Sequence, residues 1–150
     1  MNHQSQRMLA VSNPVIPGVA ALIRDNPGTI SLGQGVVHYK PPQEVFDEVT
    51  RFGNEVSHHH YQSATGLPAL REMLQDKLAR ENDIVLCEDQ ALVVTAGSNL
   101  GFYHAIMCVC DPGDEVILMS PYFFNHEMAV RMANCQPVLV PTDSNYQLQL

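Results

Sequence analysis

Apolar residues recur with helical spacing in two segments of the first half of the chain. After Pro42 the sequence predicts a helix whose apolar face is made by Val45, Val49, Phe52 and Val56, at i, i+4, i+7 and i+11. A second helix is predicted from Pro68, because proline is favoured in a first helical turn. Its apolar stripe consists of Leu67, Leu70, Leu74 and Leu78. Both patterns are typical of helices that pack one face against a core.

Glycine and proline interrupt the chain before these helices. Residues 1–13 are polar and have no periodic pattern, which predicts an arm or a frayed terminus. Residues 17–25 are predicted to form a short helix, and residues 29–32 lead into a loop that contains Gly33, Gly35, Pro41 and Pro42. We therefore expect residues 1–29 to be an arm with a short helix that precedes the domain.

The second half of the chain alternates between strand and helix patterns. We predict strands over 91–95, 115–119 and 137–140, helices over 98–110 and 123–134, and a turn at 111–114. This alternation is typical of an α/β layer with a largely parallel sheet. The helix over 98–110 is apolar around nearly its whole circumference, so we expect it to be buried against the sheet and another layer. Because the sequence stops shortly after its last predicted strand, we expect the domain to be incomplete.

The turn Ala96-Gly97-Ser98-Asn99 is the best candidate for chemistry. Glycine has no Cβ and lets a ligand approach the backbone, and Ser98 and Asn99 fall on the first turn of the predicted helix. The first amides of a helix lack partners and carry the positive end of the helix dipole. The sequence therefore predicts an anion site, such as a phosphate site, at this turn.

The composition and net charge argue against some classes of binding partner. The 150 residues carry a formal net charge of -8, which argues against nucleic acid and acidic membranes as main partners. The longest purely apolar stretches are about five residues, far below the roughly 20 that span a bilayer, and the first residues lack the apolar centre of a signal peptide. We expect a reduced, cytoplasmic protein without a membrane partner.

Cysteine and histidine leave disulfide and metal alternatives open. The cysteines are Cys87, Cys108, Cys110 and Cys135. They could form two disulfides or a metal site, but two of them lie in an apolar helical run, where cysteine commonly acts as a small hydrophobic residue, and we favour that interpretation. Residues 58–60 are consecutive histidines that would point in different directions on a helix, so we favour a solvated or helix-end triplet over a metal site.

Four motifs, in order, resemble the class I/II aminotransferases, which are fold-type I enzymes that use pyridoxal 5'-phosphate (PLP). They are SLGQG at 31–35 with two prolines after it, HYQSATGLPALRE at 60–72, TAGSNLG at 95–101 and DPGDEVILMSPYFF at 111–124. The resemblance is nearest to the branch that includes kynurenine, glutamine and methionine aminotransferases. It implies a three-layer α/β fold with a mixed, mostly parallel sheet, in which residues 30–150 are the N-terminal part of an incomplete large domain.

The resemblance also implies roles for particular residues. The segment Gly97-Ser98-Asn99 matches the amides that bind the PLP phosphate. Phe123 matches the aromatic residue that stacks on the pyridine ring, although by itself it would be an ordinary core residue. Tyr61 matches a tyrosine that crosses a homodimer interface to the other subunit's cofactor phosphate, with a loop-capping hydroxyl as the alternative. Gly35 matches the glycine that admits the substrate carboxylate, but the loop at 36–39 departs from the family pattern.

The reaction of this family moves an amino group from an amino acid to a 2-oxo acid. It needs a lysine amine that bonds to the cofactor and then transfers the substrate's α-proton. The chain has only Lys40 and Lys77, and neither matches that lysine, so no catalytic residue is assigned and we expect these 150 residues alone to be inactive. Another fold-type I enzyme, such as a carbon–sulfur lyase or a decarboxylating synthase, and a non-catalytic truncated module are the alternatives.

Overall fold

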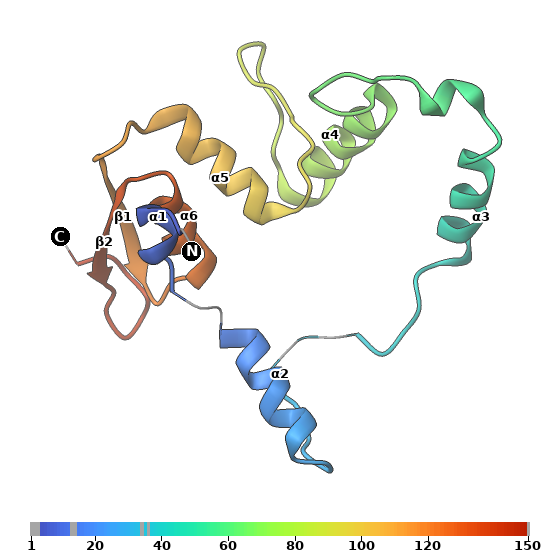
Figure 1. Ribbon diagram of the computed structural model, residues 1–150. Helices are drawn as coiled ribbons and strands as arrows, with labels where there is room; N and C mark the ends of the chain where they lie inside the picture. The colour runs from blue at the N-terminus through green and yellow to red at the C-terminus, as the bar shows by residue number, and fades with distance from the viewer. Residues whose placement is uncertain (1–3, 13–14, 34, 36, 150) are drawn as a thin grey trace. The chain divides into compact units, whose positions relative to one another are not determined.

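The computed structural model describes residues 4–12, 15–33, 35 and 37–149 (Figure 1). The contacts divide the chain into two units, which are described separately. One unit contains the residues up to 20 and from 95 onward, and the other contains residues 21–94. Parts of the predicted arm, two positions of the early loop (Gln34 and Val36) and Leu150 lie outside the described residues. The predicted arm contains a single helical turn, α1 (Gln6–Leu9), and the predicted helix that follows is confirmed as α2 (Val15–Asp25).

A parallel strand pair with a connecting helix forms the centre of the first unit. Strand β1 (Glu115–Ser120) pairs with β2 (Gln136–Pro141), and helix α6 (Phe124–Met132) connects them. The register runs from Glu115 opposite Gln136 to Ser120 opposite Pro141. Helix α5 (Ser98–Val109) packs against α6, and α6 also contacts both strands. The predicted helix–strand–helix–strand order and the parallel pairing are confirmed.

The end of α6 sets the path into β2. Asn134 adopts a left-handed φ of 60°, which asparagine tolerates better than most residues. The amide of Asn134 donates to the carbonyl of Arg131 at 3.0 Å, and the amide of Cys135 donates to the carbonyl of Val130 at 3.0 Å. This pair of bonds is the Schellman motif, which satisfies the last carbonyls of a helix and turns the chain sharply. The turn thereby brings Cys135 under α6 at the start of β2.

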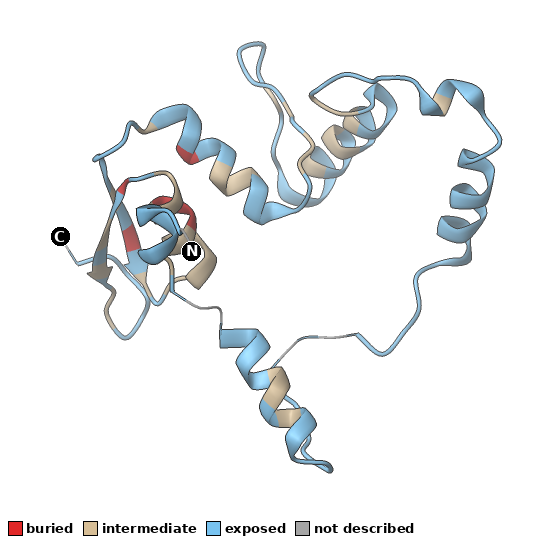
Figure 2. Ribbon diagram, in the orientation of Figure 1, coloured by how far each residue is buried: buried red, intermediate tan, exposed pale blue. Residues whose placement is uncertain are grey.

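The buried core of the described residues lies in this unit (Figure 2). Ile106 of α5, Val130 of α6 and Cys135 form one cluster, and Val130 is fully buried. The expectation that α5 is buried all round is wrong, because Met107 and Val109 are 55% and 77% exposed. Apolar residues on all sides of a helix show only that any of its faces could be buried. Helix α5 packs on α6 with one face and exposes the other to solvent.

The strand predicted over 91–95 is also wrong. This segment has no ladder partner and is held instead by two isolated bonds: the amide of Val94 donates to Thr65 O at 3.0 Å, and Arg71 Nε donates to Leu92 O at 2.9 Å. A strand needs a neighbouring strand for its backbone groups, and a β-branched composition does not supply one.

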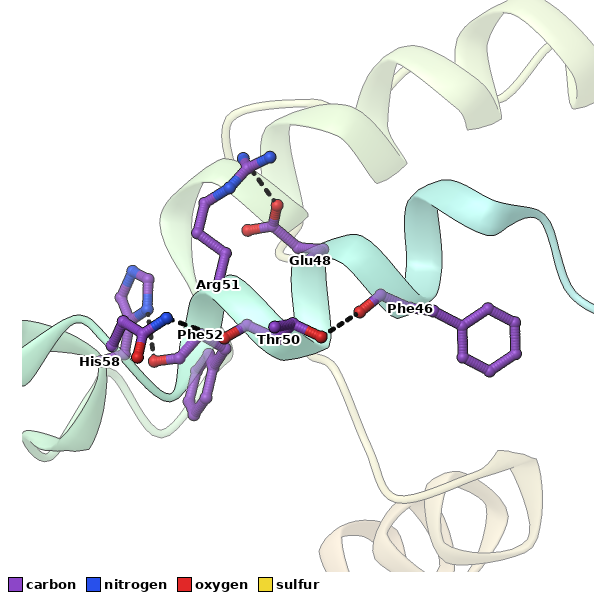
Figure 3. Close-up of polar contacts among 7 residues, drawn as sticks. Phe46, Glu48, Thr50, Arg51, Phe52 and His58 are labelled. Atoms are coloured by element: carbon purple, nitrogen blue, oxygen red, sulfur yellow. Dashed lines mark hydrogen bonds and ion pairs between the residues drawn. The ribbon is translucent and has the colours of Figure 1, made fainter.

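The second unit contains α3 (Gln43–Phe52), the 3-10 helix η1 (Val56–His59) and α4 (Pro68–Asn82). Helix α4 is confirmed, with Pro68 in its first turn, whereas α3 ends at Phe52 and its predicted face does not continue to Val56. Gly53 is the C-cap residue of α3. After it, the His58 ring stacks on the Phe52 ring with centroids 4.9 Å apart (Figure 3). Nδ1 of His58 also lies 3.2 Å from Phe52 O.

Gly66 allows the loop before α4 to approach the segment at Val94. It has a φ of +110°, and a Cβ at this position would lie 2.7 Å from Cγ2 and 2.9 Å from Cβ of Val94. Both the backbone angle and the space therefore require glycine. The sequence analysis treated this glycine only as part of a motif, because the contact joins residues that are far apart in the chain.

We predict that Gly66→Ala lowers the free energy of unfolding by about 2–4 kcal/mol, because backbone strain and overlap with Val94 add together. Chemical denaturation measures the effect. Gly28→Ala is the control: Gly28 has a φ of +91° but no atom within 4 Å of the added Cβ, so we expect strain alone, about 1–2 kcal/mol. Equal losses in the two variants would contradict the close approach to Val94.

Candidate functional site

The start of α5 has an unusual backbone. Gly97 is the N-cap residue, with φ 84° and ψ 163°, a conformation that is essentially restricted to glycine. No side chain caps the helix start, and its first turn contains no acidic residue. A Cβ at Gly97 would have no atom within 4 Å, so the space beside this residue is open. The first turn of α5 therefore has open space beside Gly97 and contains no carboxylate that would repel an anion.

Three adjacent amides point out of this helix start without a protein partner. A tight turn orients them: the amide of Gly97 donates to Thr95 O at 2.8 Å, and the Thr95 hydroxyl donates to Gly97 O at 3.0 Å. The amides of Ser98, Asn99 and Leu100 have no hydrogen-bond acceptor in the described part of the chain. Their partial positive charges and the helix dipole add, which favours a negatively charged ligand.

Thr95 and Gly101 shape this turn, although the sequence alone did not single them out. A Cβ at Gly101 would lie 3.2 Å from Thr95 Oγ1, tighter than ordinary contact, so the glycine makes room for the hydroxyl that holds Gly97. The available signal was a glycine inside an otherwise apolar helix, which usually marks a close approach.

A groove of about 530 Å³ adjoins the free amides, between α5 and α6. Ala96 and Asn99 line it at the helix start, and Tyr103, Met128 and Met132 continue it along the two helices. Its wall is mostly apolar. An anionic ligand held by the amides would thus have an apolar surface beside it, which is the usual composition of a small-molecule site.

Phe123 lies at the start of α6 as its N-cap residue and is 47% exposed. Its ring contacts Phe124 at 4.9 Å between centroids, and it meets the edge of His126 at 5.6 Å and 86°. The His126 ring in turn stacks on Phe102 of α5 at 4.1 Å. Since Phe102 lies one turn after Ser98, aromatic contacts connect Phe123 to the helix that carries the free amides. The half-exposed Phe123 ring differs from an ordinary core residue and leaves part of its surface for a ligand.

A group of three polar residues, here named the polar staple, joins the residue before Phe123 to helix α6: Tyr122, Glu127 and Arg131. The Tyr122 hydroxyl donates to Glu127 Oε2 at 2.5 Å, and Arg131 donates to Glu127 Oε1 from Nε at 2.9 Å and from Nη2 at 2.7 Å. The hydrogen bond from Tyr122, followed by that from Arg131, holds the pKa of Glu127 below its usual value of 4.5. The same bond raises the pKa of Tyr122. The sequence analysis missed this group.

Two residues of the predicted site lie in the other unit. The Tyr61 ring is fully exposed, and no hydrogen bond from its hydroxyl exists among the described residues. Gly35 is exposed, with no atom within 4 Å of an added Cβ, and its neighbours Gln34 and Val36 lie outside the described residues. The structure therefore brings Gly97, Ser98, Asn99 and Phe123 together in one unit and leaves Tyr61 and Gly35 as predictions.

The cysteines and histidines show no metal geometry in the described ranges, where no three ligand-type side chains converge. The four cysteines are free thiols. Cys135 is buried, and burial raises the pKa of its thiol, as expected for a cysteine that packs as a hydrophobic residue. None of the described helices is both long and apolar enough to cross a membrane.

Comparison with known proteins identifies the family. A family model described as aminotransferase class I and II matches residues 27–150. An aromatic aminotransferase of Arabidopsis thaliana is 35% identical over 91% of this chain, which covers 34% of that protein. A kynurenine–oxoglutarate transaminase of Homo sapiens is 30% identical over 79% of this chain, which covers 26% of it. The chain thus spans about a third or less of the length of these curated relatives.

The fold agrees with the sequence comparison. The crystal structure of the aspartate aminotransferase from Rhizobium meliloti aligns with a TM-score of 0.82 and 25% identity, over 99% of this chain and 38% of that one. The family match over most of the chain and this likeness lead to one conclusion: the chain belongs to the aminotransferase class I and II family, whose members use PLP and have the fold-type I architecture.

The charge state of the polar staple predicts a pH dependence. Because the pKa of Glu127 is lowered in the folded state, its contribution is fully present above pH 4.5 and is lost as the pH falls through the folded-state pKa. We expect Glu127→Gln to lower the free energy of unfolding by about 1–2 kcal/mol near neutral pH, and the difference from wild type to shrink below pH 4.5. Denaturant titrations across this range measure it, with the exposed Glu115→Gln as a control. A difference that is independent of pH would contradict an ionic role.

Proposed function

We propose that this member of the aminotransferase class I and II family holds PLP through two contacts: the free amides of Ser98, Asn99 and Leu100 bind its phosphate, and Phe123 stacks on its ring. The protein to which the chain belongs would transfer an amino group from an amino acid to a 2-oxo acid. The observation that carries the proposal is the run of unpaired amides after Gly97, at a helix start without a side-chain cap.

The residues at this site fit the chemistry of PLP. A phosphate monoester presents several acceptor oxygens and negative charge, which match adjacent amide donors at the positive end of a helix. The turn has open space at Gly97 and no acidic residue in the first turn of α5. A planar aromatic ring suits the exposed part of Phe123, because aromatic pairs prefer offset or edge contacts at such surfaces.

Each residue would have a simple task. The amides fix the phosphate and so anchor the ligand, Gly97 keeps the backbone open to it, and Phe123 orients the ring. Bound PLP supplies the electron sink on which amino-group transfer depends. The residues of this unit would bind and orient. The two lysines of the chain belong to the other unit, where Lys40 is exposed in a loop and Lys77 is paired with Glu81 on α4.

We extend the proposal to the two residues of the other unit. Full exposure of the Tyr61 ring supports a role outside its own chain, namely a hydrogen bond to the cofactor phosphate of a second subunit in a homodimer. The open surroundings of Gly35 support approach of a substrate carboxylate to the backbone. The net charge of -8 supports a cytoplasmic enzyme that acts on small molecules rather than on nucleic acid or membranes.

The substrate class is an amino acid paired with a 2-oxo acid. The relatives are named for aromatic amino acids, aspartate and kynurenine, so the likeness supports the reaction class across several amino donors. Product analysis of the protein with PLP distinguishes this proposal from the lyase and synthase alternatives. A new amino acid formed from the 2-oxo acid supports transfer, whereas release of ammonia or carbon dioxide in its place opposes it.

We predict that Gly97→Ala weakens binding of both PLP and inorganic phosphate by about tenfold. Alanine disfavours the φ of 84°, so the turn reorients the amides that both ligands share. Isothermal titration calorimetry measures both affinities. The control is Gly113→Ala, which introduces the same kind of strain at φ 100° in the turn before β1. If Gly113→Ala weakens phosphate binding as much as Gly97→Ala, the α5 start is not the phosphate site.

We also predict that these 150 residues form no stoichiometric covalent bond with PLP. The Lys77 amine is paired with Glu81, and neither Lys40 nor Lys77 belongs to the unit that contains the free amides of α5, so neither side chain is held at the proposed phosphate site. After incubation with equimolar PLP and reduction with borohydride, mass spectrometry is expected to show no majority label on Lys40 or Lys77. One fully labelled lysine would refute the absence of a reactive amine.

A further inference from the structure

We propose that Glu127 is a positioning residue for the cofactor ring, because the polar staple that it centres fixes the direction in which Phe123 presents its side chain. The inference rests on the proposed function, since it concerns the ring that Phe123 would stack on. It assigns a task to Tyr122, Glu127 and Arg131, which otherwise contact no part of the phosphate site.

The start of α6 needs an anchor other than a cap. Its N-cap residue, Phe123, has no side chain that can accept a hydrogen bond from the first amides, and none does so. Many helices also fix the entering chain by a contact between the residue before the N-cap and the fourth helical residue. In α6 these two positions are Tyr122 and Glu127. Their hydrogen bond is a polar counterpart of the hydrophobic contact usually found there.

The carboxylate of Glu127 is held on both oxygens. Tyr122 donates to Oε2, and two guanidinium nitrogens of Arg131 donate to Oε1, one turn further along α6. The side chain of Glu127 is only 19% exposed, so solvent screens these bonds weakly. Because three donors hold the Glu127 carboxylate in place, its hydrogen bond with the Tyr122 hydroxyl restricts the movement of Tyr122 and of the backbone at this residue.

The hydrogen bond between Tyr122 and Glu127 restricts the backbone of Phe123, which lies between these two residues in the chain. Phe123 lies between Tyr122 and the first turn of α6, with φ -76° and ψ 120°. If Tyr122 is released, this backbone can rotate, and the Phe123 ring loses its edge contact with His126 at 5.6 Å. The amides at the start of α5 belong to another element, and no hydrogen bond among the described residues joins them to the polar staple. Loss of the staple should therefore weaken ring binding and spare phosphate binding.

The test compares two ligands on the purified protein. Pyridoxine 5'-phosphate has the ring and phosphate of PLP but no aldehyde, so it cannot bond to a lysine, and inorganic phosphate has no ring. We expect Tyr122→Phe and Glu127→Gln to raise the dissociation constant of pyridoxine 5'-phosphate about three- to tenfold, the scale of one aromatic contact. The dissociation constant of inorganic phosphate should stay within about twofold. Phe123→Ala is the reference, and Glu115→Gln is the matched control.

A double-mutant cycle separates positioning from general packing. In a Phe123→Ala background, Tyr122→Phe should not change the dissociation constant of pyridoxine 5'-phosphate further, because the ring that Tyr122 helps to position is absent. Equal losses for both ligands, additive losses in the double variant, or wild-type affinity in both staple variants would overturn the positioning role. If Phe123→Ala itself leaves the preference for the ring-bearing ligand intact, the proposed ring contact fails, and this inference fails with it.

Discussion

The packing of α5 against α6 over the β1–β2 pair is the interaction on which both parts of the candidate site depend. Ile106, Val130 and Cys135 make this contact, and each buried apolar side chain contributes about 1.5–3 kcal/mol relative to exposure. The amides that we propose to bind phosphate begin α5, and Phe123, which we propose to stack on the ring, is the N-cap residue of α6, so the cluster positions the two helix starts. Because the cluster is small, the two helix starts need further fixing by local bonds.

The two helix starts are fixed in opposite ways, although neither has a side-chain cap. At α5, Thr95 holds the carbonyl of Gly97 and leaves the following amides without acceptors. At α6, the polar staple holds the residue before the N-cap and the fourth helical residue. The first arrangement keeps donors available for a ligand, and the second keeps a side chain in one orientation. Both are consistent with helix starts that serve binding rather than stability alone.

The sequence predicted the elements whose signals are local and missed features that depend on contacts between distant residues. Helices α4, α5 and α6 and the parallel strands followed from periodicity and turn residues, whereas the anion site inferred from Gly97 before a helix stays a prediction. The predictions of a strand over 91–95 and of all-round burial of α5 were wrong, because an apolar run does not show which segment it packs against. The close approaches of Gly66 to Val94 and of Gly101 to Thr95 were not predicted, because they depend on distances in the folded structure. The polar staple was missed because Tyr122 lies outside the helix that its partners share.

The proposed site would divide recognition of the cofactor between backbone amides and side chains, and this division would have a physical consequence. Backbone amides bind a phosphate in any sequence that keeps the turn, so only a change in the φ of Gly97 or in its bond to Thr95 can remove them. The proposed orientation of the ring would depend on Phe123 and on the three side chains of the polar staple, each of which a single substitution can alter. Phosphate affinity would therefore be robust to side-chain change, whereas ring orientation would be open to tuning. A family that shares one cofactor and differs in substrate can vary the second property while it keeps the first.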